Sequence, residues 1–98
     1  MERRISTTPE FRKKSEKICR YIENEFGKKA VLVISKLDRR INSILDNPER
    51  GRPLIKRKNV RSIIFQPHNK IYYKIYPSRI TILNIIDMRQ NPDKNPFK

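Results

Sequence analysis

Three short apolar runs in the second half of the chain predict a β-sheet. They cover residues 60–65, 71–76 and 80–86, and β-branched and aromatic side chains dominate them. The links between them, residues 66–69 and 77–79, are short clusters rich in turn-forming residues. Because a parallel crossover needs a dozen or more residues, such short links favour antiparallel neighbours. We therefore expect a β-meander.

The alternation within these runs predicts one covered face and one charged face. In the middle run, alternation places Ile71, Tyr73 and Ile75 on one face and Tyr72, Lys74 and Tyr76 on the other. The third run is apolar on both sides, with Ile80, Ile82 and Ile86 on one face and Leu83 and Ile85 on the other. A strand with two apolar faces belongs inside a sheet. The second face of the meander is expected to carry Arg, Lys and Tyr side chains.

Two helices are predicted before the meander. The sequence Thr7-Thr8-Pro9-Glu10 is typical of a helix start, because Thr caps free N–H groups, Pro suits the first turn and Glu10 completes a capping box with Thr7. This helix ends at Gly27, and a second one, from about residue 29 to residue 46, ends before Pro48. Their apolar stripes comprise Phe11, Ile18, Ile22 and Phe26, and Ala30, Val33, Leu37, Ile41 and Ile44. The short link predicts a helical hairpin on one face of the sheet.

Together these elements predict an α+β fold with the order β-α-α-β-β-β. Residues 4–7 are expected to add an edge strand ahead of the helices. The length of 98 residues suits a single domain, residues 1–98, with one core. The end of the chain, residues 88–98, contains two Pro residues and lacks periodicity, so we expect an extended and partly mobile tail.

Charge is the strongest departure from an average composition. The chain has 24 Lys and Arg against 10 Asp and Glu, which gives a formal net charge of +14. Such a charge repels itself, which implies a polyanion or an acidic protein as partner. Residues 50–61, here called the basic stretch, hold six cations and no carboxylate. We expect a nucleic acid or another target, bound with steep salt dependence, to contact Arg50, Arg52, Lys56, Arg57 and Lys58.

Cations and aromatic residues also interleave on the predicted sheet. Lys74 and Tyr72 are candidate target contacts, because such a combination suits a phosphate backbone with unstacked bases. Ordinary packing on a sheet surface accounts for the same pattern equally well. His68 is the only histidine and lies in a predicted turn, where an exposed histidine without a catalytic role is the commoner case.

Other kinds of site are not expected. Cys19 is the only cysteine, which excludes an internal disulfide, and one His without a carboxylate cluster predicts no metal site. Because the sequence has no P-loop, dinucleotide-binding glycine pattern or nucleophile elbow, we expect no cofactor. No apolar run reaches the ~20 residues of a membrane span, and no signal-peptide core is present, so we expect a cytoplasmic protein without a membrane partner.

Four motifs follow the two predicted helices in order. They are LDNPERGR at residues 45–52, VRS at 60–62, KIYYKIY at 70–76 and ITILNIIDMRQNP at 80–92. This ordered set resembles the RelE/ParE toxin superfamily of bacterial type II toxin–antitoxin systems, over about residues 5–94. The resemblance implies a β-α-α-β-β-β fold, a small basic toxin that inhibits growth, and a role in plasmid stabilisation. It also implies a cognate antitoxin that wraps and neutralises the toxin, and we expect antitoxin carboxylates to face the basic stretch.

The superfamily divides by cellular target. RelE-like members cleave mRNA on the ribosome with cationic sheet residues, which Arg61, Lys70 and Arg89 match by position, and with a Tyr or His near the C-terminus. After Arg89 this chain has neither, so His68 or a Tyr of the sheet would have to donate the proton to the leaving oxygen. ParE-like members lack the nuclease residues and inhibit DNA gyrase. The absence of the terminal acid brings this chain nearer to them.

Three functions are consistent with these features. The favoured one is a non-nuclease, gyrase-directed toxin. The alternatives are a ribosome-dependent mRNA endoribonuclease, the one case in which we expect an enzyme, and a non-toxic basic nucleic-acid-binding module. For either toxin the partners are a cognate antitoxin and a target, gyrase or ribosome-bound mRNA. The free toxin is expected to be a monomer or a dimer.

Overall fold

The order of elements confirms the predicted α+β arrangement. The computed structural model describes residues 3–66, 68–89 and 95–97. The elements are β1 (Arg4–Thr7), α1 (Pro9–Phe26), α2 (Ala30–Asp46), β2 (Arg52–Pro53), β3 (Val60–Gln66), β4 (Asn69–Ile75) and β5 (Arg79–Asp87). The short 3-10 turns η1 (Gly27–Lys29) and η2 (Pro48–Arg50) follow the two helices. The edge strand at residues 4–7 is confirmed, and the structure adds one short strand, β2, that the sequence did not predict.

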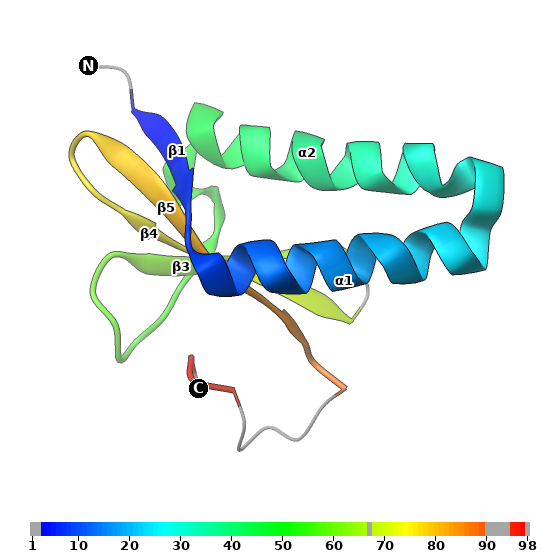
Figure 1. Cartoon of the computed structure of the whole chain (residues 1–98). Helices are drawn as coiled ribbons and strands as arrows, with labels where there is room; N and C mark the ends of the chain where they lie inside the picture. The colour runs from blue at the N-terminus through cyan, green and yellow to red at the C-terminus, as the bar shows by residue number, and fades with distance from the viewer. Residues whose placement is uncertain (1–2, 67, 90–94, 98) are drawn as a thin grey trace.

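The five strands form one sheet in the order β1-β5-β4-β3-β2. The three strands of the meander, β3, β4 and β5, pair antiparallel as their short links predict, whereas β1 lies parallel beside β5. Figure 1 shows α1 and α2 side by side along one face of this sheet, with the hairpin turn beyond the strands. The first and last strands of the chain, β1 and β5, are therefore neighbours in the sheet.

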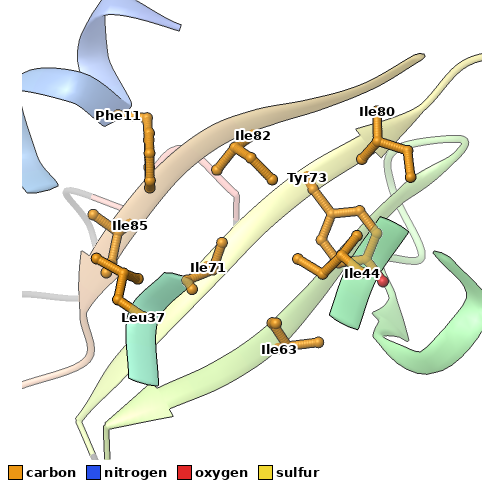
Figure 2. Close-up of a cluster of buried hydrophobic side chains, with 9 residues drawn as sticks. All are labelled: Phe11, Leu37, Ile44, Ile63, Ile71, Tyr73, Ile80, Ile82 and Ile85. Atoms are coloured by element: carbon orange, nitrogen blue, oxygen red, sulfur yellow. The ribbon is translucent and has the colours of Figure 1, made fainter. Parts of the chain in front are cut away.

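The core lies between the helical hairpin and the sheet. In Figure 2, Phe11 of α1 and Leu37 and Ile44 of α2 point toward the apolar side chains of β3, β4 and β5. The largest fully buried side chains are Tyr73, Ile44, Ile71, Ile80, Ile82 and Ile85. The predicted helix stripes are confirmed where the helices cover strands. Near the hairpin turn Phe26 is 49% exposed, because the helices extend past the sheet there.

A β-bulge decides which residues of β5 face the core. Consecutive residues of β4 pair with Asn84 and Ile82, so Leu83 between them has no partner on β4. This extra residue inverts the alternation that follows, and Ile85 lies in the core while Ile86 pairs on the opposite face. The prediction that Ile86, and not Ile85, shares the face of Ile82 is therefore wrong. Strict alternation assumes an uninterrupted strand, and a bulge breaks it.

Thr8 joins the first helix to this bulge. Its hydroxyl accepts a hydrogen bond from the N–H of Phe11 at 3.2 Å, as an N-cap does, and donates one to the carbonyl of Leu83 at 2.5 Å. The predicted capping box between Thr7 and Glu10 is wrong, because Thr7 belongs to β1 and the cap falls one residue later. The start of α1 is thereby fixed on the strand that it covers.

The buried hydroxyl of Tyr73 fixes the link between α2 and the sheet. It donates a hydrogen bond to the carbonyl of Pro48 at 2.6 Å and accepts one from the N–H of Gly51 at 3.0 Å. Burial raises the pKa of Tyr73, against the opposing effects of the Gly51 hydrogen bond and the charge of Arg61. A Cβ at position 51 would collide with this hydroxyl and lie 2.9 Å from the carbonyl of Ser62, so the close approach requires glycine.

Tyr73→Phe removes this hydroxyl and keeps the ring. The Gly51 N–H and the Pro48 carbonyl then lose a buried partner, so we expect the free energy of unfolding to fall by about 1–3 kcal/mol. Urea unfolding followed by circular dichroism measures the change. Tyr21→Phe is the control, because the Tyr21 side chain is 59% exposed. Its effect should stay below about 0.5 kcal/mol. Equal stability of the two variants would contradict the bridging role of Tyr73.

Candidate functional site

The basic stretch forms an exposed hairpin at one edge of the sheet. Strand β2 pairs antiparallel with β3, and the N–H of Leu54 donates to the carbonyl of Val60 at 2.9 Å to close the loop. Asn59 turns the chain with a φ of 63°, a conformation that Asn tolerates better than most residues. The hairpin exposes the predicted cations Arg50, Arg52, Lys56, Arg57 and Lys58.

No carboxylate neutralises these cations in the described part of the chain. The ion pairs found there are Arg20 with Glu16 and Arg89 with Asp87, and neither involves the basic stretch. Like charges without counterions repel one another and weaken a fold. The hairpin is therefore suited to a partner that brings negative charge.

Arg61 lies apart from the exposed cations, although it belongs to the same stretch. It pairs with Tyr73 across β3 and β4, so it shares the face that the helices cover. Its Nη1 donates hydrogen bonds to the carbonyls of Glu49 at 3.1 Å and Gly51 at 2.8 Å. Arg61 and Tyr73 thus hold the same link, and Arg61 is not on the second face of the sheet, where it was expected.

The open face of the sheet, opposite the helices, carries the other predicted cations and aromatic residues. Lys70 and Lys74 of β4 lie there, with the Lys74 Nζ 5.2 Å from the ring centroid of Tyr76. The guanidinium of Arg79 lies 4.2 Å from the same centroid. Tyr72 belongs to this face as well, yet it is only 4% exposed.

The end of the chain covers Tyr72. The ring of Phe97 stacks on that of Tyr72, with centroids 4.4 Å apart and planes 12° apart. The Nδ2 of Asn95 donates to the Tyr72 hydroxyl at 3.3 Å. On the outer side, Arg57 places its guanidinium 4.8 Å from the Phe97 centroid and donates to the carbonyl of Pro96 at 3.0 Å. A residue predicted to meet a target is thus capped by the chain itself.

The sequence did not predict this packing of residues 95–97. The signal in the sequence is slight, a single Phe among polar residues and prolines, and only the tertiary contacts give it a partner. Residues 90–94 and Lys98, to which the prediction of a mobile tail also applies, lie outside the described residues.

A groove of about 670 Å³ lies between α1 and the end of the sheet where β5 finishes. Its lining combines apolar side chains, among them Ile18, Ile22 and Ile85, with polar ones that include His68 and Arg89. The Nη2 of Arg89 forms an ion pair at 2.9 Å with Asp87. Hydrogen bonds from Arg89 hold the pKa of Asp87 below its usual value, and Asp87 raises the pKa of Arg89 in return.

The four candidate catalytic residues are not gathered at one place. His68 and Arg89 both line the groove, whereas Lys70 lies on the open face. Arg61 pairs with Tyr73, which lies four residues after the first residue of β4. Four residues of strand span about 13 Å. The structure brings together one cation and the histidine, and it separates the other two cations from them.

The described part of the chain contains one thiol, that of Cys19. Across residues 3–66, 68–89 and 95–97, no cluster of three or more His, Cys, Asp or Glu side chains could hold a metal ion. Cys19 is half-buried on α1, and burial raises the pKa of its thiol. Among the same described residues no helix is long and apolar enough to span a membrane.

Solved structures of bacterial toxin–antitoxin proteins share this fold. A structure described as the chromosomal ParDE TA system from P. aeruginosa has a TM-score of 0.72 and 16% sequence identity, covering 87% of this chain and 95% of that chain. A structure of the E. coli DinJ–YafQ toxin–antitoxin complex has a TM-score of 0.66 and 14% identity, covering 91% of this chain and 96% of that one. At such identities the similarity establishes the fold, a helical hairpin on a mostly antiparallel sheet.

The family model defines the protein more narrowly. The family described as the ParE toxin of the type II toxin–antitoxin system parDE matches residues 5–92. The chain belongs to this family, as the resemblance of the motifs predicted. No curated protein matches the sequence significantly.

Arg61→Met should destabilise the fold, because the carbonyls of Glu49 and Gly51 lose a charged donor. We expect the free energy of unfolding to fall by about 1–2 kcal/mol. Arg52→Met is the matched control: Arg52 is exposed on the neighbouring strand, and its loss should cost less than about 0.5 kcal/mol. Thermal unfolding of both variants at one salt concentration measures the difference. Two variants of equal stability would show that Arg61 does not hold the link.

Arg89→Gln should raise the pKa of Asp87, because the hydrogen bonds from Arg89 are the main cause of its depression below 3.8. A depressed carboxyl pKa stabilises the fold above the unfolded value and loses that contribution as the pH falls through the folded value. Carbon-detected NMR titration of Asp87 between pH 2 and pH 6 measures the shift. The variant should therefore be slightly less stable than the wild type at neutral pH, and the difference should vanish at acid pH, where Asp87 is protonated in both. An unchanged Asp87 midpoint in the variant would contradict the assigned cause.

Proposed function

We propose that this protein is a growth-inhibiting toxin that a cognate antitoxin neutralises, and that it acts by binding DNA gyrase. Its membership of the ParE family over residues 5–92 carries the proposal. Two similar structures are toxin–antitoxin assemblies, ParDE and DinJ–YafQ, which supports an antitoxin partner here as well. The proposal makes the protein an inhibitor that works by contact.

The placement of the cations supports an inhibitor that is not a nuclease. Cleavage of RNA by its 2′-hydroxyl needs positive charge and a proton donor around one phosphate. Arg61 is engaged by two backbone carbonyls, and Arg89 is paired with Asp87 at the other end of β4. A target protein, in contrast, requires only a stable surface with complementary charge.

The exposed hairpin of the basic stretch is the surface that we assign to the acidic face of the antitoxin. Its cations Lys56, Arg57 and Lys58 project from the loop between β2 and β3. Complementary charge accelerates association and fixes the register of two proteins. The affinity of this pair should accordingly fall as salt rises.

An endoribonuclease is the second candidate, and one observation favours it. His68, Asp87 and Arg89 line the same groove, and a histidine in a groove that also carries a cation can serve as acid or base. The sheet tyrosines are less available, because the hydroxyl of Tyr73 bonds two backbone groups and the ring of Tyr72 lies under Phe97. A nuclease in this fold would therefore depend on His68.

Induced expression of the protein should stop bacterial growth, and co-expression of the small protein encoded beside it should restore growth. Purified protein should then inhibit DNA supercoiling by gyrase and leave ribosome-bound mRNA intact. A His68→Ala/Arg89→Ala double variant should remain fully toxic, because neither residue is needed for binding gyrase in this proposal.

Two outcomes would contradict the proposal in different ways. Cleavage of ribosome-bound mRNA by the wild type, with loss of toxicity in a folded double variant, would establish the nuclease. Normal growth at high expression of soluble protein, together with binding of nucleic acid, would leave a non-toxic basic module as the function.

A further inference from the structure

The packing of Phe97 defines a narrow slot on the open face of the sheet. Its inner wall is the ring of Tyr72, nearly parallel to the Phe97 ring, and its outer wall is the guanidinium of Arg57. Phe97 itself is half-buried, so its ring meets solvent at one side, and Arg57 is exposed. Two planar groups therefore hold a third between them at a site that solvent can reach.

Such a slot selects for planar rings and makes few other demands. An aromatic ring and a guanidinium plane both stack on nucleobases, and the stack tolerates any base because every base has a π face. The Tyr72 hydroxyl adds one polar group at the edge of the slot, where Asn95 now bonds it. A base that replaced the Phe97 ring would meet both walls and this hydroxyl.

The charge around the slot decides between a base and an aromatic side chain. The loop that carries Arg57 also carries Lys56 and Lys58, and the basic stretch holds six cations without a carboxylate. Further along the same face, Lys74 and Arg79 flank the ring of Tyr76. A base of a nucleic acid brings phosphates that neutralise these cations, whereas an isolated aromatic side chain brings no negative charge.

We propose that the slot between Tyr72 and Arg57 is a stacking site for a base of single-stranded nucleic acid, which Phe97 occupies in the free protein. The base and Phe97 compete for the same walls, so the tail weakens binding without contacting any phosphate. The phosphates interact with Lys56, Lys58 and Lys74, which gives the salt dependence. This site is independent of the proposed inhibition of gyrase, and either can fail without the other.

Phe97→Ala tests the competition, because it empties the slot and leaves the charge unchanged. We expect a fluorescein-labelled ten-nucleotide oligothymidylate to bind the variant roughly tenfold more tightly than the wild type at fixed salt, within the range for one base on an aromatic ring. The slope of log Kd against log salt should stay the same, since no cation is removed. Phe26→Ala, which truncates an exposed Phe at the hairpin turn, should bind like the wild type.

Two controls separate stacking from charge. An abasic oligonucleotide of equal length keeps the phosphates and should bind Phe97→Ala and wild type alike. Adding Arg57→Lys to Phe97→Ala keeps the charge but removes the planar wall, and it should abolish most of the gain. Circular dichroism and thermal unfolding confirm that each variant is folded. If Phe97→Ala is unfolded, a Phe97→Leu variant, which removes the aromatic ring but keeps the apolar contact, replaces it.

Photo-crosslinking gives a second, independent measurement. An oligonucleotide with 5-iodouracil should crosslink to Tyr72 in Phe97→Ala, and less in the wild type. Equal affinity of folded Phe97→Ala and wild type, or an equal gain with the abasic strand, would overturn the proposal. So would a gain seen only with an acidic, Phe-rich peptide, because the slot would then serve a protein partner.

Discussion

The hydroxyl of Tyr73 is the contact on which the arrangement of the surface depends. It bonds two backbone groups of the link that follows α2, and Arg61 bonds two carbonyls of the same link. This link leads directly into β2 and the basic stretch. The hydrogen bonds therefore set where the hairpin leaves the sheet, and hence where Arg57 lies above the open face. Glycine at position 51 is required by the same contact, since any side chain would displace the hydroxyl.

Two adjacent tyrosines of β4 have different roles, one in the core and one at the candidate stacking site. Tyr73 faces the helices and is fully buried in the core, whereas Tyr72 faces away and is covered by Phe97. The alternation of a strand places consecutive side chains on opposite faces, so one pair of residues connects the core to the candidate interface. The bulge at Leu83 preserves this division on β5, because it brings Ile85 into the core beneath the helices.

The positive charge of the protein is consistent with its family membership. A small core under a helical hairpin supports a surface whose cations have no carboxylate partner in the described part of the chain, apart from the ion pairs on α1 and beside Arg89. Self-repulsion of this kind is tolerable when a partner neutralises it, as an antitoxin would. The groove beside α1 and the stack on the open face are formed by different residues, so they are separate surfaces of the molecule.

Local patterns were sufficient for the two helices, the meander and the concentration of charge, because caps, alternation and turns depend on near neighbours. They failed where distant segments meet. Alternation alone placed Ile86, and not Ile85, on the face of Ile82, because the bulge that reverses this order is set by pairing with β4. Arg61 was predicted to be a surface cation. Its hydrogen bonds to two carbonyls depend on how the link after α2 folds back over the sheet. The sequence did not indicate a role for Phe97, because Tyr72 is distant in the chain and only the folded structure stacks the two rings.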